Sequence, residues 1–143
     1  MKIPFPLLML KAYRAQQAKI RPNMAEHGLS PGQPKILSML LLQGPCRQKD
    51  LAALCDIDPG TVSRLLNSMQ KEGMITRTEE EADRRVTKIE ITEKGRALHA
   101  AHQQYRNEVE QMALAGFSEE EKERFAAYLC RMYENLTGRL LES

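Results

Sequence analysis

Apolar positions of this chain recur every three or four residues over most of its length, which predicts a mainly α-helical fold. The segment IPFPLLML at 3–10 begins a first helix, and it is too short and too interrupted by proline to span a membrane. The segment SPGQ at 30–33 has the pattern of a capping box with proline at the first helical position. It predicts a second helix that begins at residue 31 and that Gly44-Pro45 ends.

Two shorter helices are predicted next. The segment RQKDLAALCDI at 47–57 carries an apolar stripe on a short helix, and Asp58-Pro59 repeats the signal of a cap followed by proline. The helix that follows runs to Gly73, and a tight turn at 56–58 joins the pair. Its apolar residues fall at i, i+3, i+4 and i+7, so one stripe is buried; they are Val62, Leu65, Leu66 and Met69.

The opposite face of this last helix is polar and compact. Small residues permit close approach to a DNA groove, while hydroxyls, an amide and an arginine can meet base edges and phosphates, as a helix in the major groove requires. The alternative is an ordinary solvated face. The candidate DNA-binding residues on it are Gly60, Thr61, Ser63, Arg64, Asn67, Ser68 and Lys71.

A β-hairpin is predicted after Gly73. The segments MITRT at 74–78 and VTKIEIT at 86–92 read as strands, the second with Ile89 and Ile91 on its inner face, and the charged turn EEEADRR joins them. The order helix, turn, helix, hairpin is that of a winged helix.

The segments LAALCDIDPGTVSRLLNSMQKEGMITRT at 51–78 and DRRVTKIEITEKG at 83–95 resemble the DNA-binding core of the MarR family of bacterial transcription regulators. The wing of that family carries an Asp-x-Arg pair, here Asp83 and Arg85, and then a strand with an Ile/Leu-Thr-x-x-Gly ending. The helix after Gly28 and the helical segments at both ends also resemble the family. This chain departs from the pattern at Cys46, where the family often has a Ser or Thr cap, and at Asp56, where glycine is common.

The acidic start of the hairpin has a physical interpretation. An arginine that must enter a narrow minor groove benefits from being held in place, and Asp83, on the same side of an extended strand, can orient the guanidinium of Arg85. The resemblance implies the same pair. Arg84 joins the candidate DNA-binding residues. Glu79, Glu80 and Glu81 are assigned to the outer part of the loop, either to discourage non-specific phosphate contacts or simply as a solvated loop.

The two ends of the chain carry apolar stripes that a module of this size cannot cover. A long helix is predicted after Gly95, Gly116 breaks it, and SEEE at 118–121 caps another that continues to Leu140. These helices are expected to pack against a second copy, which gives a homodimer and two DNA-binding helices for a palindromic operator. The candidate dimerisation residues are Phe5, Leu8, Phe125, Leu129, Met132, Leu136 and Leu140.

The predicted fold class is therefore mainly α with a small β-hairpin: a winged helix-turn-helix domain plus dimerisation helices from both termini. The expected organisation is an N-terminal dimerisation helix at 1–29, a DNA-binding module at 30–95 and C-terminal dimerisation helices at 96–143, in one compact chain.

Composition narrows the chemistry. The 21 basic and 19 acidic residues give a net charge of only +2, so DNA binding must come from local charge, and 17 of the basic residues precede Gly116. Three cysteines lack the spacing of a disulfide framework or a zinc site, which fits the reducing cytoplasm. No nucleophile with a base, no metalloprotease motif and no phosphate-binding glycine loop is found, so an enzyme is not expected.

Two alternatives concern sensing. Cys46, at a helix N-terminus beside Arg47, is a possible redox site because its pKa would be lowered there; packing or capping is the alternative. His99 and His102 lie at i and i+3 and could share a metal with a carboxylate; two exposed helical histidines are the alternative, and no metal or other cofactor is expected.

The sequence thus predicts a cytoplasmic, DNA-binding transcription regulator that acts as a ligand-responsive repressor. Its expected partners are double-stranded DNA, a second copy of itself and a small-molecule effector. No membrane partner is expected. A winged helix used only for protein contacts is the rival interpretation; a polar helix face together with a tethered wing arginine disfavours it.

Overall fold

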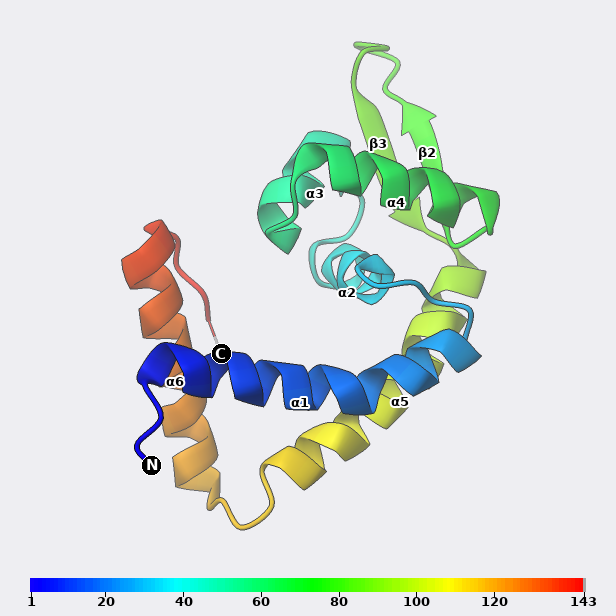
Figure 1. Cartoon of the computed structure of the whole chain (residues 1–143). Helices are drawn as coiled ribbons and strands as arrows, with labels where there is room; N and C mark the ends of the chain where they lie inside the picture. The colour runs from blue at the N-terminus through cyan, green and yellow to red at the C-terminus, as the bar shows by residue number, and fades with distance from the viewer. Residues whose placement is uncertain (143) are drawn as a thin grey trace. The chain divides into compact units, whose positions relative to one another are not determined.

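The computed structural model describes residues 1–142 (Figure 1). Its helices and strands, in chain order, are α1 (Phe5–Glu26), α2 (Gln33–Gln43), β1 (Cys46–Arg47), α3 (Gln48–Cys55), α4 (Pro59–Lys71), β2 (Ile75–Glu79), β3 (Thr87–Ile91), α5 (Glu93–Ala113) and α6 (Glu119–Thr137). The chain divides into two compact units, Met1–Asn107 and Glu108–Ser143, and each is described by itself.

The sheet is antiparallel with the strand order β1-β3-β2. The predicted hairpin is present, with Ile75 opposite Ile91 and Glu79 opposite Thr87. The third strand was not predicted, because two residues are too few for alternation to be visible. β1 places Cys46 opposite Ile89, so the expectation that Cys46 starts a helix is wrong; Arg47 is the N-cap of α3.

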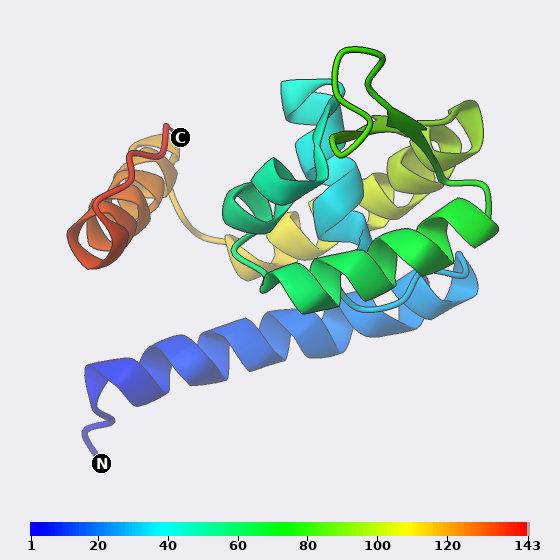
Figure 2. The ribbon, with the colours of Figure 1, turned by 90° about the horizontal axis from the view of Figure 1, so that it is seen from above.

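One apolar core joins α2, α3, α4 and the sheet. Leu37, Leu51, Leu66 and Ile89 have no exposed surface, and they come from these four elements. Three residues of the predicted stripe on α4 are buried and Leu65 is half-buried, as the helical spacing requires. Figure 2 shows the sharp turn by which α3 passes into α4, where Asp56 adopts left-handed backbone angles with φ 53°.

The start of α2 differs from the prediction. Gly32 is the N-cap in a left-handed conformation with φ 92°, and the Ser30 hydroxyl makes no capping bond. The reverse half of the capping box does form, since the Ser30 backbone N–H donates to Oε1 of Gln33 at 2.9 Å. The tight backbone bend at Gly32 therefore delays the helix to residue 33.

The Thr-x-x-Gly ending of the hairpin has a steric cause. The Thr92 hydroxyl donates to the Gly73 carbonyl at 2.6 Å and accepts from the Gly95 N–H at 3.0 Å. A Cβ at Gly95 would collide with the Met74 carbonyl oxygen, so only glycine permits α5 to begin this close to the start of β2.

In the second unit, Ser118 and Glu121 form the predicted capping box at the start of α6. The helix ends at Thr137, where Gly138 takes a left-handed conformation with φ 72°, so Leu140 lies beyond the helix on which it was predicted. Across residues 1–142, the structure contains six helices and this one small sheet, which confirms a mainly α fold class. No helix in this range is long and apolar enough to cross a membrane.

Candidate nucleic-acid interface

The N-terminus of α4 is held by a short chain of polar side chains. Asp58 is the N-cap, as predicted, and its carboxylate accepts from the Thr61 backbone N–H at 2.9 Å and from the Thr61 hydroxyl at 2.5 Å. These hydrogen bonds from Thr61 lower the pKa of Asp58. The same hydroxyl accepts from Arg64 at 3.1 Å, so the arginine is steadied along the first turns of the helix.

The predicted DNA-binding residues of α4 all lie on one side of the helix, away from the apolar stripe. Gly60, Arg64, Asn67 and Lys71 are exposed, whereas Thr61, Ser63 and Ser68 are half-buried. The exposed set combines two cations with an amide and one residue without a side chain. Such a face can approach DNA closely and donate hydrogen bonds to it.

Ser68 is already occupied within the fold. Its hydroxyl accepts from Gln33 and donates to Glu72, both at 3.4 Å. Gln33 is fully buried beneath it. Ser68 therefore contributes to the packing of α4 on α2, which sequence periodicity could not distinguish from a position free to contact DNA.

The predicted pairing of the wing arginine is present. Asp83 accepts from the backbone N–H of Arg85 at 3.0 Å and from its Nε at 3.1 Å, and Nη2 lies 3.3 Å from the second carboxylate oxygen. Hydrogen bonds from Arg85 lower the pKa of Asp83. The two residues lie in a turn closed by the Val86 N–H on the Asp83 carbonyl, and not on an extended strand as the prediction assumed.

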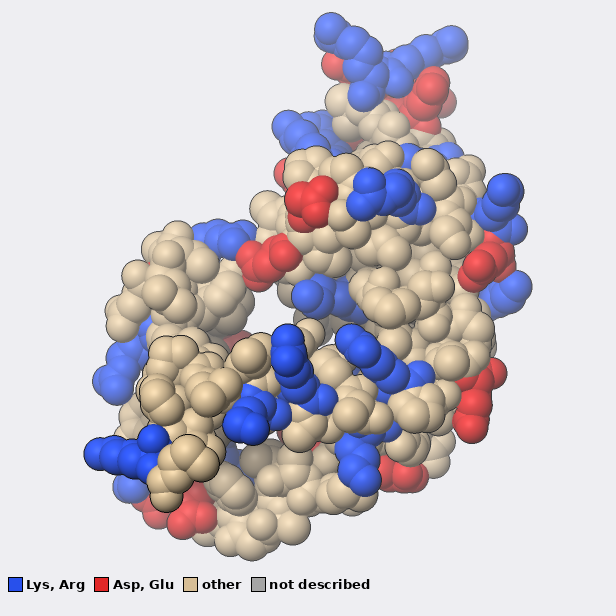
Figure 3. All heavy atoms as spheres, in the orientation of Figure 1, with Lys and Arg blue, Asp and Glu red and all other residues tan. Residues whose placement is uncertain are grey.

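The side chain of Arg85 is 91% exposed, so the pairing orients it without covering it. Arg84 beside it is exposed as well. On the face drawn in Figure 3, basic side chains stand at the tip of the hairpin with acidic side chains directly beneath them. A guanidinium held in this way can enter a narrow groove with little further loss of side-chain freedom.

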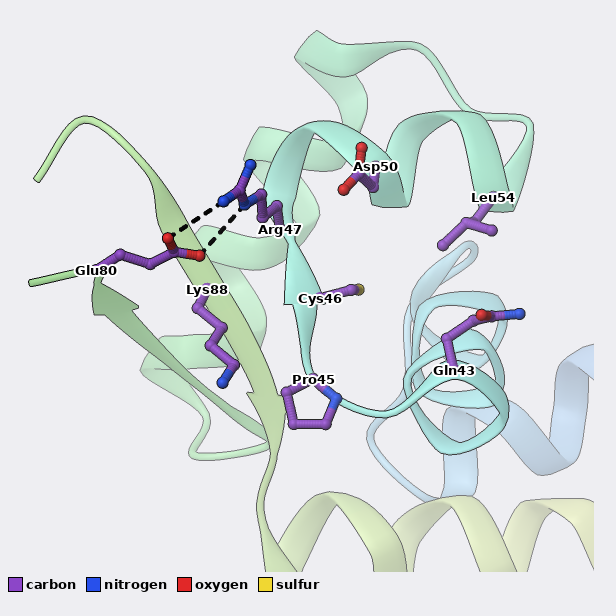
Figure 4. Close-up of a pocket in the computed structure, with 8 residues that line it drawn as sticks. All are labelled: Gln43, Pro45, Cys46, Arg47, Asp50, Leu54, Glu80 and Lys88. Atoms are coloured by element: carbon purple, nitrogen blue, oxygen red, sulfur yellow. Dashed lines mark hydrogen bonds and ion pairs between the residues drawn. The ribbon is translucent and has the colours of Figure 1, made fainter. Parts of the chain in front are cut away.

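Glu80 corrects the interpretation of the acidic segment. Its carboxylate accepts two hydrogen bonds from Arg47, at 3.2 and 3.3 Å, and ties the loop end of β2 to the start of α3. Figure 4 shows the Arg47 side chain reaching Glu80 across the strands. Glu80 is therefore a structural partner, whereas Glu79 and Glu81 are exposed.

A third arginine links the hairpin to both helices. Arg77 of β2 donates from Nη2 to Oε1 of Gln48 on α3 at 2.8 Å, and from Nη1 to Oδ1 of Asn67 on α4. Sequence reasoning placed Arg77 in a strand and assigned it no role. No local pattern marks a contact between residues ten and 29 positions apart.

A basic groove of about 430 Å³ lies between α3 and the hairpin. Arg47, Lys49 and Arg85 line it together with Gln48, and none of its lining residues, all within the described part of the chain, is acidic. Lys49 was not among the predicted site residues, although a cation in the first turn of the first helix of a helix-turn-helix is a signal for phosphate contact. The groove extends the positive face from α4 to the wing.

The reactive-thiol argument for Cys46 is wrong. Partial burial and the nearby Asp50 carboxylate raise the pKa of Cys46 above its ordinary value, which disfavours the nucleophilic thiolate. Figure 4 shows its side chain pointing away from Arg47, the cation that was expected to activate it. Burial also raises the pKa of Cys55, to about 11.

The two α5 histidines are not exposed, contrary to the default interpretation. His102 is buried, its Nδ1 donates to Asn23 Oδ1 at 3.0 Å, and its Nε2 has no hydrogen-bond partner among the described residues. Burial and Arg106 lower its pKa to about 4. His99 is half-buried and shares a hydrogen bond of 2.9 Å with the Ser38 hydroxyl. Residues 1–142 contain no cluster of three or more His, Cys, Asp or Glu suited to a metal ion.

A second hollow, of about 290 Å³, lies among α1, α2 and α5 within the first unit. Three cations line it, Arg21, Lys35 and Arg106, and its apolar walls include Ile20 and Met39. Among the described residues that line it there is no carboxylate.

Comparison with known proteins agrees with this geometry. A family model described as "MarR family" matches residues 27–86. The chain is 28% identical over 111 residues to the HTH-type transcriptional regulator YdgJ of Bacillus subtilis (strain 168), covering 78% of this chain and 68% of that protein. It is 32% identical over 101 residues to the regulator YwhA of the same bacterium, covering 68% of this chain and 70% of that protein.

Among solved structures, the transcriptional regulator SlyA superposes with a TM-score of 0.85 at 26% identity, and the match covers 94% of each chain. The chain spans 59% to 68% of the length of the first three curated relatives that it matches.

The chain belongs to the MarR family, and its fold is the winged helix-turn-helix of MarR-type transcription regulators. The resemblance seen in the sequence is therefore confirmed. YdgJ, YwhA and SlyA are each named as a transcriptional regulator, so the expected class of function, a transcription regulator and not an enzyme, is confirmed.

Proposed function

We propose that this chain is a repressor that binds a palindromic operator as a homodimer and releases it when a small anionic molecule binds. The observation that carries the DNA-binding part is the pairing of Arg85 with Asp83 at the tip of the hairpin, beside the exposed polar face of α4. A winged helix that served protein contacts alone would not need an oriented, 91% exposed arginine at that position.

In this proposal α4 enters the major groove and Arg85 the adjacent minor groove. The α4 residues Gly60, Thr61, Ser63, Arg64, Asn67 and Lys71 contact bases or phosphates, and Arg84 contacts the backbone. Ser68 supports the packing of α4. The proposed DNA-binding module is residues 30–95, the range expected from the sequence.

The homodimer is supported by apolar side chains exposed on the terminal helices. Phe5 and Leu8 of α1 are 63% and 49% exposed, and Phe125 and Leu129 of α6 are 49% and 44% exposed. Leu136 and Leu140 are more exposed still and Met132 is half-buried. A stripe of this kind is a solubility liability unless a second surface covers it. A two-fold dimer that covers it presents two α4 helices to two half-sites.

The DNA part is tested by selecting, from random duplexes and from fragments of the source genome, those that the full-length protein retains, and by sedimentation of the protein alone and with a selected duplex. The expected result is an inverted repeat bound by two chains. Retention without any sequence preference, or one chain per selected site, would contradict the proposal.

The effector is proposed to bind the hollow among α1, α2 and α5. Three cations attract an anion, since no acidic residue is among the described residues that line the hollow, while the apolar walls favour a ring or short hydrocarbon body. Figure 3 shows further basic side chains gathered over α1, which add to the positive potential. A protein with the same fold, BpsR of Bordetella bronchiseptica, has its DNA binding regulated by 6-hydroxynicotinic acid, which also combines a ring with an acid.

Benzoate and its uncharged analogue benzamide separate charge from shape. Benzoate should raise the melting temperature and release operator DNA at concentrations where benzamide does neither. Arg106→Gln should abolish the response to benzoate, whereas Arg96→Gln, on the same helix but outside the hollow, should retain it. Equal effects of the two compounds, or an undiminished response in Arg106→Gln, would exclude this hollow as an anion site.

A further inference from the structure

Arg77 is half-buried behind the DNA-facing side of the module, and its guanidinium reaches an amide on each of the two helices. We propose that Arg77 is a positioning residue that orients Gln48 and Asn67 so that both present N–H donors to DNA. This inference rests on the proposed DNA-binding function and names a determinant of its sequence specificity.

The orientation of the two amides follows from chemistry. A guanidinium has only hydrogen-bond donors, so an amide that bonds to it must turn its oxygen inward. The Gln48 oxygen lies 2.8 Å from Nη2 of Arg77, and the Asn67 oxygen accepts from Nη1. The NH2 group of each amide is therefore directed away from the arginine. A bond to a charged donor is stronger than one between neutral groups, so the orientation is held firmly.

Both amides lie where DNA is expected. Gln48 lines the basic groove with Lys49 and Arg85, and Asn67 lies on the exposed face of α4, three residues from Arg64. Arg77 itself sits opposite Ile89 in the sheet. One side chain thus connects β2, α3 and α4. The relative placement of these elements determines which DNA sequence the module would recognise.

The consequence is a change in what Asn67 can recognise. A free asparagine reads adenine with both its oxygen and its NH2 group. With its oxygen committed to Arg77, Asn67 offers donors, which match acceptors: N7 of guanine or adenine, O6 of guanine, O4 of thymine, or a phosphate oxygen. We expect a base acceptor for Asn67, in the groove that α4 enters, and a phosphate for Gln48, in the basic groove.

The test is a double-mutant cycle on a selected operator duplex with the full-length protein. Asn67→Ala should weaken operator binding by about tenfold, which is near the upper end of the range that one hydrogen bond contributes. Arg77→Met should weaken it at least as much, because both amides lose their orientation. The double variant should bind no more weakly than Arg77→Met alone, since the Asn67 donor is effective only when oriented. Gln70→Ala, an exposed neighbour on α4, should leave binding unchanged.

A purely structural role for Arg77 is distinguished by the base preference. Arg77→Met and Asn67→Ala should lose selectivity at the same operator position, whereas a loosened fold would lower binding to all duplexes alike. Arg77→Lys keeps the positive charge but has one nitrogen in place of the two that bond to Gln48 and Asn67. Compared with Arg77→Met, it should recover the melting temperature but only part of the selectivity.

Additive effects of Arg77→Met and Asn67→Ala, or selectivity lost at different positions, would overturn the inference. If the wild-type protein selected no operator at all, the proposed function would be overturned instead. Failure of the inference and failure of the proposed function are therefore distinguishable. Uniform weakening of all duplexes by Asn67→Ala would assign its donor to a phosphate and refute the base acceptor.

Discussion

The proposed DNA-binding face of the module and the apolar faces of α1 and α6 are both exposed, but they are built in opposite ways. On the module, polar side chains are engaged within the chain: Arg85 with Asp83, Arg77 with Asn67 and Arg64 with Thr61. On α1 and α6, large apolar side chains such as Phe5 and Leu136 are exposed.

The difference shows which surface a single chain can complete. Hydrogen bonds within the chain orient the polar face without a partner, so this face is ordered before DNA binds. Apolar surface gains free energy only when another apolar surface removes it from water. The module is therefore complete as one chain, and the terminal helices are completed in the proposed dimer.

The largest expected effect comes from breaking the proposed dimer. Leu129→Glu, or removal of the chain after Gly116, should lower operator affinity by about 100- to 10,000-fold, because two linked modules gain from effective concentration. Sedimentation should show a monomer or, for the truncated chain, aggregation. Ala127→Glu adds the same charge on the other side of α6 and should leave both properties unchanged. A monomer that binds one half-site as tightly as the full-length protein binds its palindrome would contradict the dimer.

A buried polar side chain of α5 gives the next effect, on stability. His102 is neutral in the folded chain because its pKa is lowered to about 4, while in the unfolded chain it takes up a proton near pH 6.5. Between these values the unfolded state binds more protons, so the free energy of unfolding should fall as pH falls from 6.5 to 4, by up to about 3 kcal/mol.

The measurement is urea unfolding across this pH range for wild type and His102→Gln. The variant cannot bind that proton, so the difference between the two curves should shrink as pH falls and then level off below pH 4. Parallel curves would show that His102 does not set the pH dependence. The substitution also removes the unpartnered Nε2 and so changes stability at every pH. The two proteins are therefore compared by the slope of the free energy of unfolding against pH, and not by its value at one pH.

The wing is expected to affect DNA binding without affecting the fold. Arg85→Ala should weaken operator binding by about 1 to 3 kcal/mol and reduce the preference for A·T pairs beside each half-site. Fluorescence anisotropy with operator and with flank-substituted duplexes measures both. Unchanged affinity in this titration would exclude Arg85 from the interface. Its side chain is 91% exposed, so its removal should not disturb the fold and the titration reports on DNA contact alone.

The smallest effect is expected from Asp83→Ala. Arg85 would keep its charge but lose its orientation, so operator affinity should fall less than in Arg85→Ala, with the same flanking preference reduced. Asp83→Asn retains a hydrogen-bond acceptor and should lie between wild type and Asp83→Ala. A loss greater than that of Arg85→Ala would mean that Asp83 does more than orient the arginine.

Local patterns in the sequence were sufficient for most elements of the fold. Helical spacing located α1, α4, α5 and α6, and the Asp58 cap and the Ser118 box are present as predicted. The Asp83–Arg85 pair was also predictable, because its members are two residues apart. Each of these features depends on residues within one or two turns of each other, so the sequence displays them directly.

Features that depend on distant residues were decided by the tertiary structure. The strand containing Cys46 exists only because β3 lies beside it. This pairing places Cys46 in a strand, and not at the helix N-terminus that the sequence predicted. Glu80 became a structural partner because Arg47, 33 residues earlier, reaches it. His102 is buried because Asn23 of α1 packs on α5.

The same division applies to the candidate site. The sequence alone determined the family, through its resemblance to the MarR pattern, and also the polar face of α4 and the wing arginine, which follow from short-range spacing. Only the tertiary structure decided that Arg77 joins Gln48 to Asn67, that Lys49 belongs to the basic groove, and that Ser68 is engaged by Gln33. Periodicity specifies which face of a helix a side chain occupies, whereas its hydrogen-bond partner depends on the packing of elements that are remote in sequence.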